Sequence, residues 1–292
     1  MVERIKHSIL AQIIPGLQSL PRRGPAGWIT IMGFGLVTPI VLMTLFAPWI
    51  SPRNPSQTST NPILPPSQEF PLGTNQLGQD MLSRLFWGGS IMIQVAVVSV
   101  LICLVIGVPI GLLASYAGGI PDKATSLVMD SVYAFPGLVL AIAIAATLGR
   151  GVVNMAFSIA VVYIPSYFRV IRSQVLTIKE LPYTEAAKSI GARRRTVLFR
   201  YILPNVVPSI VVVATVNFAD AILTAAGLTF VGLGVEKTIP DWGYDLVDGR
   251  ALLPSGAWWV IAFPGLMILL LALVFTLIGE GLSELLSPRL EQ

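Results

Sequence analysis

The sequence has very few of the side chains on which metal, disulfide and catalytic sites depend. Its 292 residues contain one cysteine, Cys103, and one histidine, His7. A single cysteine excludes a disulfide within the chain, and one residue of each kind excludes a Cys/His metal cluster. A phosphate-binding loop of the pattern G-x-x-x-x-G-K-S/T is also missing, so the chain cannot bind ATP in the Walker manner. We therefore predict no metal, no cofactor and no catalytic residues.

Charged residues are scarce and unevenly placed. Only 12% of the residues are charged and 54% are hydrophobic, whereas about a quarter of a soluble domain is charged. A soluble globular protein is excluded. Uncharged stretches long enough for the roughly 20 residues that cross a bilayer lie between Arg23 and Arg53, Arg84 and Asp122, Asp130 and Arg150, and Arg150 and Arg169, and two further spans cover residues 206–231 and 258–278. The predicted fold class is an all-α membrane protein with six transmembrane helices.

The orientation follows from the distribution of Lys and Arg between alternate loops. One side holds fourteen: Arg4, Lys6, Arg22, Arg23, Lys123, Arg169, Arg172, Lys179, Lys188, Arg193, Arg194, Arg195, Arg200 and Arg289. The other side holds five: Arg53, Arg84, Arg150, Lys237 and Arg250. The positive-inside rule places the richer side in the cytoplasm. We therefore predict a multi-pass protein of the plasma (inner) membrane with both termini cytoplasmic.

The chain divides into three parts in sequence. Residues 1–27 are predicted to form a cytoplasmic amphipathic segment on the lipid surface, residues 28–86 the first transmembrane helix with its outer loop, and residues 87–292 a core of five transmembrane helices. Trp28 and Trp49 flank the first span about 32 Å apart, as a helix with ~1.5 Å per residue requires. Prolines inside the spans predict kinked helices, and these are Pro39, Pro109, Pro136, Pro165, Pro208 and Pro264.

A cytoplasmic segment at about residues 171–205 has the pattern of helix, glycine turn and helix. Pro182 suits a first helical position, Glu185 suits a first turn, and Gly191 supplies a left-handed stop. The second helix is predicted to run from about Ala192 until Pro204. Because the first helix has only about nine residues, it needs a partner to pack against. The arginines at 193–195 are either steered by acidic groups of that partner or serve ordinary positive-inside anchoring.

Two outer segments are candidates for partner contact. Within residues 72–85, Gly73 and Asn75 predict a turn, and a short helix packed on the outer mouth is predicted to follow, with Leu77, Met81, Leu82 and Leu85 on one face. The last outer loop contains Asp241, Trp242, Asp245 and Asp248, which predict either an acidic docking surface or a plain aromatic belt at the headgroups.

Two carboxylates fall in or near the spans. Ionisable groups at membrane depth are functional candidates, so Asp220 and Asp130 are predicted to line a translocation path. A secondary transporter or channel that uses them as ion or proton sites is the alternative. No inverted repeat supports it. A membrane-embedded enzyme would have to use the same two carboxylates, because His7 and Cys103 cannot assemble a nucleophile, base and orienting group.

The cytoplasmic segment carries a resemblance to a known motif. Glu185-Ala186-Ala187, then Gly191 after three residues, then Leu203-Pro204, resembles the EAA motif of inner-membrane permease subunits of ATP-binding cassette importers. That motif usually has Ile two residues before the Leu, where this chain has the apolar Tyr201.

Longer stretches are similar to the dipeptide, oligopeptide and nickel permease family, C-type subunit, and they cover the chain from about residue 70 to its end: residues 70–85, 228–234, 242–243, 263–265 and 287–290. The resemblance implies a type I importer bundle with a cytoplasmic coupling helix that an ATPase receives, carried by Glu185, Ala186, Ala187, Gly191, Ala192, Arg193, Leu203 and Pro204. It implies as partners a second homologous permease, two ATP-binding subunits and an external or periplasmic substrate-binding protein, with membrane lipid around the spans and no nucleic acid. Small peptides are the implied solutes, with nickel complexes, glutathione-like molecules and sugars as alternatives.

Overall fold

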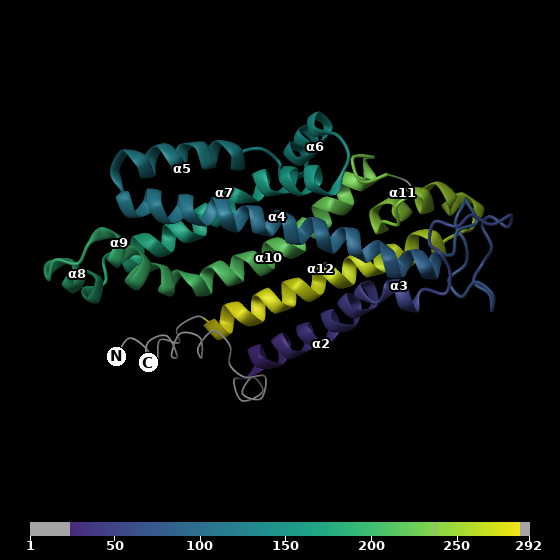
Figure 1. Ribbon diagram of the computed structural model, residues 1–292, viewed down its shortest axis with the longest axis horizontal. Coiled ribbons are helices and arrows are strands. Elements are labelled where there is room, and N and C mark those ends of the chain that lie inside the picture. Colours follow the sequence, from purple (N-terminus) through teal and green to yellow (C-terminus); the bar gives the residue numbers. More distant parts are fainter. Residues whose placement is uncertain (1–23, 237, 287–292) are drawn as a thin grey trace.

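The computed structural model describes residues 24–236 and 238–286, and the regular elements in these residues are all helices (Figure 1). Most of the predicted amphipathic segment at 1–27, and the motif at 287–290, lie outside the described residues. The helices are α2 (Pro25–Leu45), α3 (Ala47–Ile50), α4 (Met81–Ala117), α5 (Gly119–Tyr133), α6 (Gly137–Leu148), α7 (Val152–Ile178), α8 (Pro182–Ser189), α9 (Arg194–Thr196), α10 (Leu203–Phe230), α11 (Trp242–Leu252) and α12 (Trp259–Leu286), with a π-helix at Val197–Ile202 and a 3-10 turn at Leu253–Ser255.

The long helices run side by side along the length of the molecule (Figure 1). Helices α8 and α9 lie at one end, and the loop of residues 51–80 lies with α11 at the other (Figure 1). We refer to these as the α8 end and the α11 end. In the described residues five helices are long and apolar enough to cross a membrane, and the bent pair α5 and α6 makes a sixth span if counted as one. The predicted all-α membrane fold is confirmed.

The third span, between Asp130 and Arg150, is interrupted at Pro136, where the sequence predicted a kinked helix. The chain bends by 89° between α5 and α6. Pro136 lies at this break with φ −57° and ψ 120°. A break is expected there, because proline has no N–H to donate and disfavours helical backbone at the residue before it. Helix α6 has 12 residues, which cover only about 18 Å. The third span is therefore a broken one.

Helices α4 and α7 pack at very short range. A Cβ added at Gly107 would lie 3.0 Å from the Tyr167 side chain, and one added at Gly111 would lie 3.0 Å from Ile171. Glycines one turn apart on α4 thus face residues one turn apart on α7, and both α7 side chains are fully buried. Small residues permit this approach of two membrane helices. Helices α4 and α7 therefore pack with their backbones close together at this point.

The first span packs on the last. At Gly33 of α2 a Cβ would meet Ile278 of α12 at 2.5 Å, and Gly281 of α12 lies against Thr30 of α2. Trp28 and Trp49, near the two ends of this span, are 56% and 76% exposed. Exposed tryptophans at both ends suit the two headgroup layers.

Helix α4 begins at Met81, at the α11 end of the molecule. Asp80 caps the helix through its carboxylate, which accepts a hydrogen bond from the Ser83 N–H at 2.9 Å. The predicted short helix starts later than expected and is not a separate element, because residues 72–80 contain no helix and residues 81–85 are the first turns of α4. Met81 and Leu85 are buried, as predicted for its packed face. Leu77, expected on its packed face, is 47% exposed. The boundary drawn between residues 86 and 87 falls inside α4.

Candidate functional site

Helix α8 stands at the tip of the α8 end, tied to the end of α7. Pro182 lies in its first turn after Leu181. The Thr184 hydroxyl donates to the Ile178 carbonyl at 2.9 Å, and this accounts for one carbonyl at the end of α7. Thr184 and Ala187 are the buried side chains of α8, so the helix rests on one narrow face and presents the rest outward.

Gly191 ends α8 in the predicted way. Its φ is 85°, in the left-handed region, and its N–H donates to the Lys188 carbonyl at 3.0 Å. The next N–H, of Ala192, reaches back to the Ala187 carbonyl at 3.0 Å. These two bonds form a Schellman motif, which favours glycine because a Cβ is disfavoured at this φ. The predicted left-handed stop is confirmed.

The outward surface of α8 mixes apolar and charged side chains. Tyr183 is 42% exposed and Ile190 is 83% exposed, and Glu185 and Ala186 lie between them in sequence, also exposed. The Lys188 ammonium turns back to donate to the Lys179 carbonyl at 3.2 Å. Ile190 is the C-cap of α8, so the most exposed apolar side chain of this segment lies at the C-terminal end of the helix.

The helix after Gly191 is longer than the sequence predicted. Instead of ending at Pro204, it continues from α9 through the π-helix into α10, so that residues 194–230 form one candidate span. Pro204 has no N–H for the Arg200 carbonyl, and the widened π-turn precedes it. Leu203 and Pro204 open α10. Ala192 is half-buried, and Arg193, Arg194 and Arg195 are exposed.

The four residues expected to form an acidic docking surface are all buried. Asp241, Trp242 and Asp245 have no exposed surface, and Asp248 has 7%. The prediction that these side chains contact a partner is wrong. Asp241 is the N-cap of α11, and Trp242, Asp245 and Asp248 are buried side chains of the same helix.

Two of these buried side chains, Asp245 and Trp242, have polar partners at the start of α4. The Asp245 carboxylate accepts from the Arg84 Nε at 2.7 Å, and both side chains are shielded from solvent. The Trp242 indole donates to the Leu85 carbonyl at 2.9 Å. Its ring needs the absence of a side chain at Gly88, where a Cβ would lie 2.5 Å away. Helix α11 is thereby fixed to the start of α4.

Asp241 is the N-cap of α11, and its carboxylate accepts from the Tyr244 N–H at 2.9 Å. Burial raises the pKa of Asp241 from its ordinary 3.8 to about 7, and neighbouring Asp245 adds to the rise. Burial also raises the pKa of Asp245, against the attraction of Arg84. Low-dielectric surroundings disfavour the charged form of a carboxylate.

Sequence reasoning missed the amide residues that complete this network. The Gln79 side-chain oxygen accepts from Arg84 Nη1 and from the Asn75 amide, both at 2.8 Å. The sequence offered no signal for these amides, because Arg84 and Asp245, the pair that they support, are 161 residues apart.

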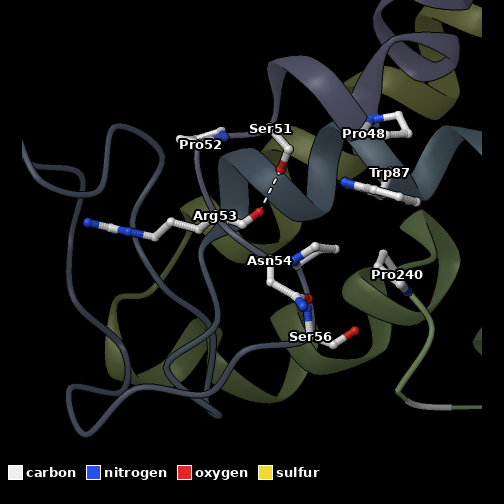
Figure 2. A pocket seen from close by; sticks show the side chains of 9 residues that line it. Pro48, Ser51, Pro52, Arg53, Asn54, Ser56, Trp87 and Pro240 are labelled. Carbon is white, nitrogen blue, oxygen red and sulfur yellow. Dashed lines mark hydrogen bonds between the residues drawn. The ribbon is translucent and has the colours of Figure 1, made fainter.

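A pocket of about 520 Å³ lies beside this network on the α11 end (Figure 2). Its lining comes from the end of the first span, the following loop, α4 and the last outer loop: Pro48, Ser51, Pro52, Arg53, Asn54, Pro55, Ser56, Trp87 and Pro240. The Arg53 guanidinium points away from it (Figure 2) and pairs with Glu69 at 3.4 Å. The pocket is therefore lined by proline, indole and short polar groups rather than by charge.

The two candidate path residues lie in different surroundings. Asp220 is half-buried on α10, one turn before Thr224, whose hydroxyl lies 2.9 Å from the Tyr163 hydroxyl of α7. It thus shares the polar side of α10 that meets α7. Asp130 is exposed on α5 and accepts from Arg169 at 3.0 Å. The structure does not bring the two carboxylates into one hydrogen-bonded site, and their place along a path stays a prediction.

Comparison with known proteins decides the family. A family model described as the binding-protein-dependent transport system inner membrane component matches residues 107–292, which include α8 and Gly191. The chain belongs to this family. It is 41% identical over 262 residues to the di/tripeptide transport system permease protein DppC of Pseudomonas aeruginosa, which covers 86% of this chain and 85% of that protein.

Other members are similarly close. The dipeptide transport system permease protein DppC of Alkalihalophilus pseudofirmus is 37% identical over 264 residues, 90% of this chain and 86% of that one. The glutathione transport system permease protein GsiD of Pectobacterium atrosepticum is 41% identical over 226 residues, 77% and 75% of the two chains. The resemblance found in the sequence is confirmed. The chain is a multi-pass inner-membrane permease subunit of an ATP-binding cassette importer, a transport protein and not the ATPase.

Proposed function

We propose that this permease admits small peptides, including glutathione-like tripeptides, into the cytoplasm. The support is that the related permeases over most of its length are those of di/tripeptide, dipeptide and glutathione systems. These solutes share a peptide backbone with charged ends, so one type of path can serve all of them. Sugars and nickel complexes have no such support from these relatives.

The proposed complex contains a second homologous permease, two cytoplasmic ATP-binding subunits and an external substrate-binding protein. The observation that carries it is the exposed α8, a helix of eight residues, below the ~12–15 that are even marginally stable alone. It nevertheless presents Ile190 and Tyr183 outward. An ATPase that covers this face gives the helix the packing that it lacks.

In this arrangement α8 is the coupling helix, with Glu185, Ala186, Ala187, Gly191, Ala192 and Arg193 at or beside the contact and Leu203 and Pro204 leading back into the membrane. The α8 end is cytoplasmic, in agreement with the fourteen Lys and Arg residues of that side. Both termini then lie in the cytoplasm. The α11 end faces outward and receives the binding protein, with the buried Asp245 and Arg84 holding it rigid behind the contact.

The experiment is transport by the purified complex in proteoliposomes. With ATP inside and loaded binding protein outside, we expect uptake of a radiolabelled dipeptide and of glutathione, in competition with each other. Uptake should survive collapse of the proton gradient while ATP is retained. Uptake that stops with the gradient and ignores ATP would instead favour a secondary transporter that uses Asp130 and Asp220, and would overturn the proposal.

A further inference from the structure

Helix α5 is held to the rest of the chain in an unusual way for a membrane helix. Asp122, a carboxylate, is its one buried side chain. Its large apolar residues point away from the described chain, with Ile120 at 82% exposure and Leu127 at 71%. Hydrophobic packing therefore contributes little to the position of α5, because that contribution depends on the apolar area removed from solvent by the contact.

Two ion pairs with α7 hold the helix instead. The Arg172 guanidinium donates to both oxygens of Asp122, at 2.7 and 2.8 Å. Further along α5, Arg169 donates to Asp130 at 3.0 Å, and its guanidinium lies 4.2 Å from the centre of the Tyr133 ring. A bidentate guanidinium–carboxylate pair fixes orientation as well as distance. Helix α5 is thus attached to α7 at two points.

The attachment points lie on the helix that leads into α8. Helix α7 ends at Ile178, and α8 starts at Pro182. The Thr184 hydroxyl bond to Ile178 and the Lys188 bond to Lys179 tie α8 back to the end of α7. On the other side, α5 leads through the 89° bend into α6. Helix α5 therefore joins α7, which leads into α8, to α6 on the far side of the bend.

We propose that the pairs Asp122–Arg172 and Asp130–Arg169 form a latch that makes α5 move with α7 and α8, so that displacement of α8 is transmitted to the bend before α6. The inference rests on the proposed function, since an ATPase must displace α8. The four side chains are positioning residues and touch no solute. Asp130, predicted from sequence as a path residue, acts here through Arg169. Rigid-body transmission of this kind requires attachments that hold in both states of the transporter.

The first test compares solute taken up with ATP hydrolysed, in the complete complex in proteoliposomes with the loaded binding protein and a labelled dipeptide. Asp122→Asn and Arg172→Gln each break the bidentate pair. We expect stimulated ATP hydrolysis to persist and uptake per ATP to fall about tenfold, within the usual range of coupling between distant sites. The exchanged double variant, Asp122→Arg with Arg172→Asp, should recover most of the ratio. Lys123→Gln is the matched control, since it removes a charge from the same helix outside both pairs.

The second test does not depend on the solute or on disruptive variants. In a Cys103→Ala background, spin labels are placed in pairs at three exposed positions, Ala124 of α5, Ser189 of α8 and Glu284 of α12. The distances between the labels are measured with and without ATP. The latch requires an unchanged distance from 124 to 189 and a changed distance from 124 to 284. A change from 124 to 189 as large as that from 124 to 284 would overturn the latch, as would single variants with an unaltered uptake ratio. Failure of the unmodified complex to take up peptide counts against the proposed function alone.

Discussion

Replacement of Gly191 by valine isolates the geometry of the coupling segment from everything else in the chain. A Cβ at Gly191 would meet nothing within 4 Å, so the substitution causes no clash. Its cost comes from the φ of 85°, which an L-residue with a side chain adopts at about 1–2 kcal/mol. That cost lowers the population with α8 correctly terminated roughly 5- to 30-fold.

We therefore expect Gly191→Val to reduce peptide uptake and stimulated ATP hydrolysis by about that factor, while membrane abundance and assembly with the second permease stay unchanged. Gly256→Val is the matched control. Its φ is 84°, its Cβ would also meet nothing within 4 Å, and it lies between α11 and α12. Gly191→Asn should retain most activity, since asparagine tolerates the left-handed region.

The assay is ATP hydrolysis by the reconstituted complex with and without loaded binding protein, normalised to the amounts of permease and ATPase in the liposomes. Equal losses in Gly191→Val and Gly256→Val would mean that general strain explains the effect. Full activity in Gly191→Val, together with full activity in Glu185→Lys, would refute the reasoning that this segment transmits the ATPase motion.

Three further predictions concern the α11 end and are measured as thermal unfolding of the purified complex. Because the pKa of Asp241 is raised from 3.8 to about 7, the folded state favours its protonated form, so stability should fall as pH rises between these values and Asp241→Asn should remove that dependence. Gly88→Ala should cost about 1–3 kcal/mol by overpacking against the indole of α11, whereas Gly35→Ala, with open space around it, should not destabilise. Arg84→Met should cost about 3–5 kcal/mol by leaving a buried carboxylate unpaired, and adding Asp245→Leu should restore part of the loss; an additive double variant would show that the two side chains do not interact.

The spans and the α8 turn could be predicted because each depends on short-range sequence. A helix that crosses a bilayer requires about 20 predominantly apolar residues in a row, and the stretches between the charged residues are long enough to meet this requirement. The stop at Gly191 follows from backbone sterics at one position. Five of the six prolines in the predicted spans lie inside helices, and only Pro136 marks a break. Composition does not distinguish these cases, because the outcome depends on whether neighbouring helices satisfy the freed backbone groups.

The burial of Asp245 could not be predicted because its partner is distant in sequence. Arg84 lies 161 residues away, and each side chain alone has the pattern of a solvated outer charge. The same holds for Asp122 and Arg172, which are 50 residues apart. Sequence spacing identifies pairs within one helix, whereas pairs between helices depend on which spans become neighbours. A charged residue beside a membrane span can therefore be buried against a partner from a distant helix, which sequence spacing does not reveal.

The placement of polar contacts indicates which end of the subunit can change shape. At the α11 end, the Arg84–Asp245 pair is fully buried, and separating such a pair leaves charges unpaired at a cost of about 3–5 kcal/mol. At the α8 end, the Arg169–Asp130 pair is more than half exposed and contributes only about 0–1 kcal/mol, so the bidentate Arg172–Asp122 pair is the stronger attachment of α5 to α7. Beyond these pairs the chain bends by 89° between α5 and α6. We therefore expect the ATPases to move α5, α7 and α8 together and the change of shape to occur at the bend before α6, while the α11 end moves as one rigid block.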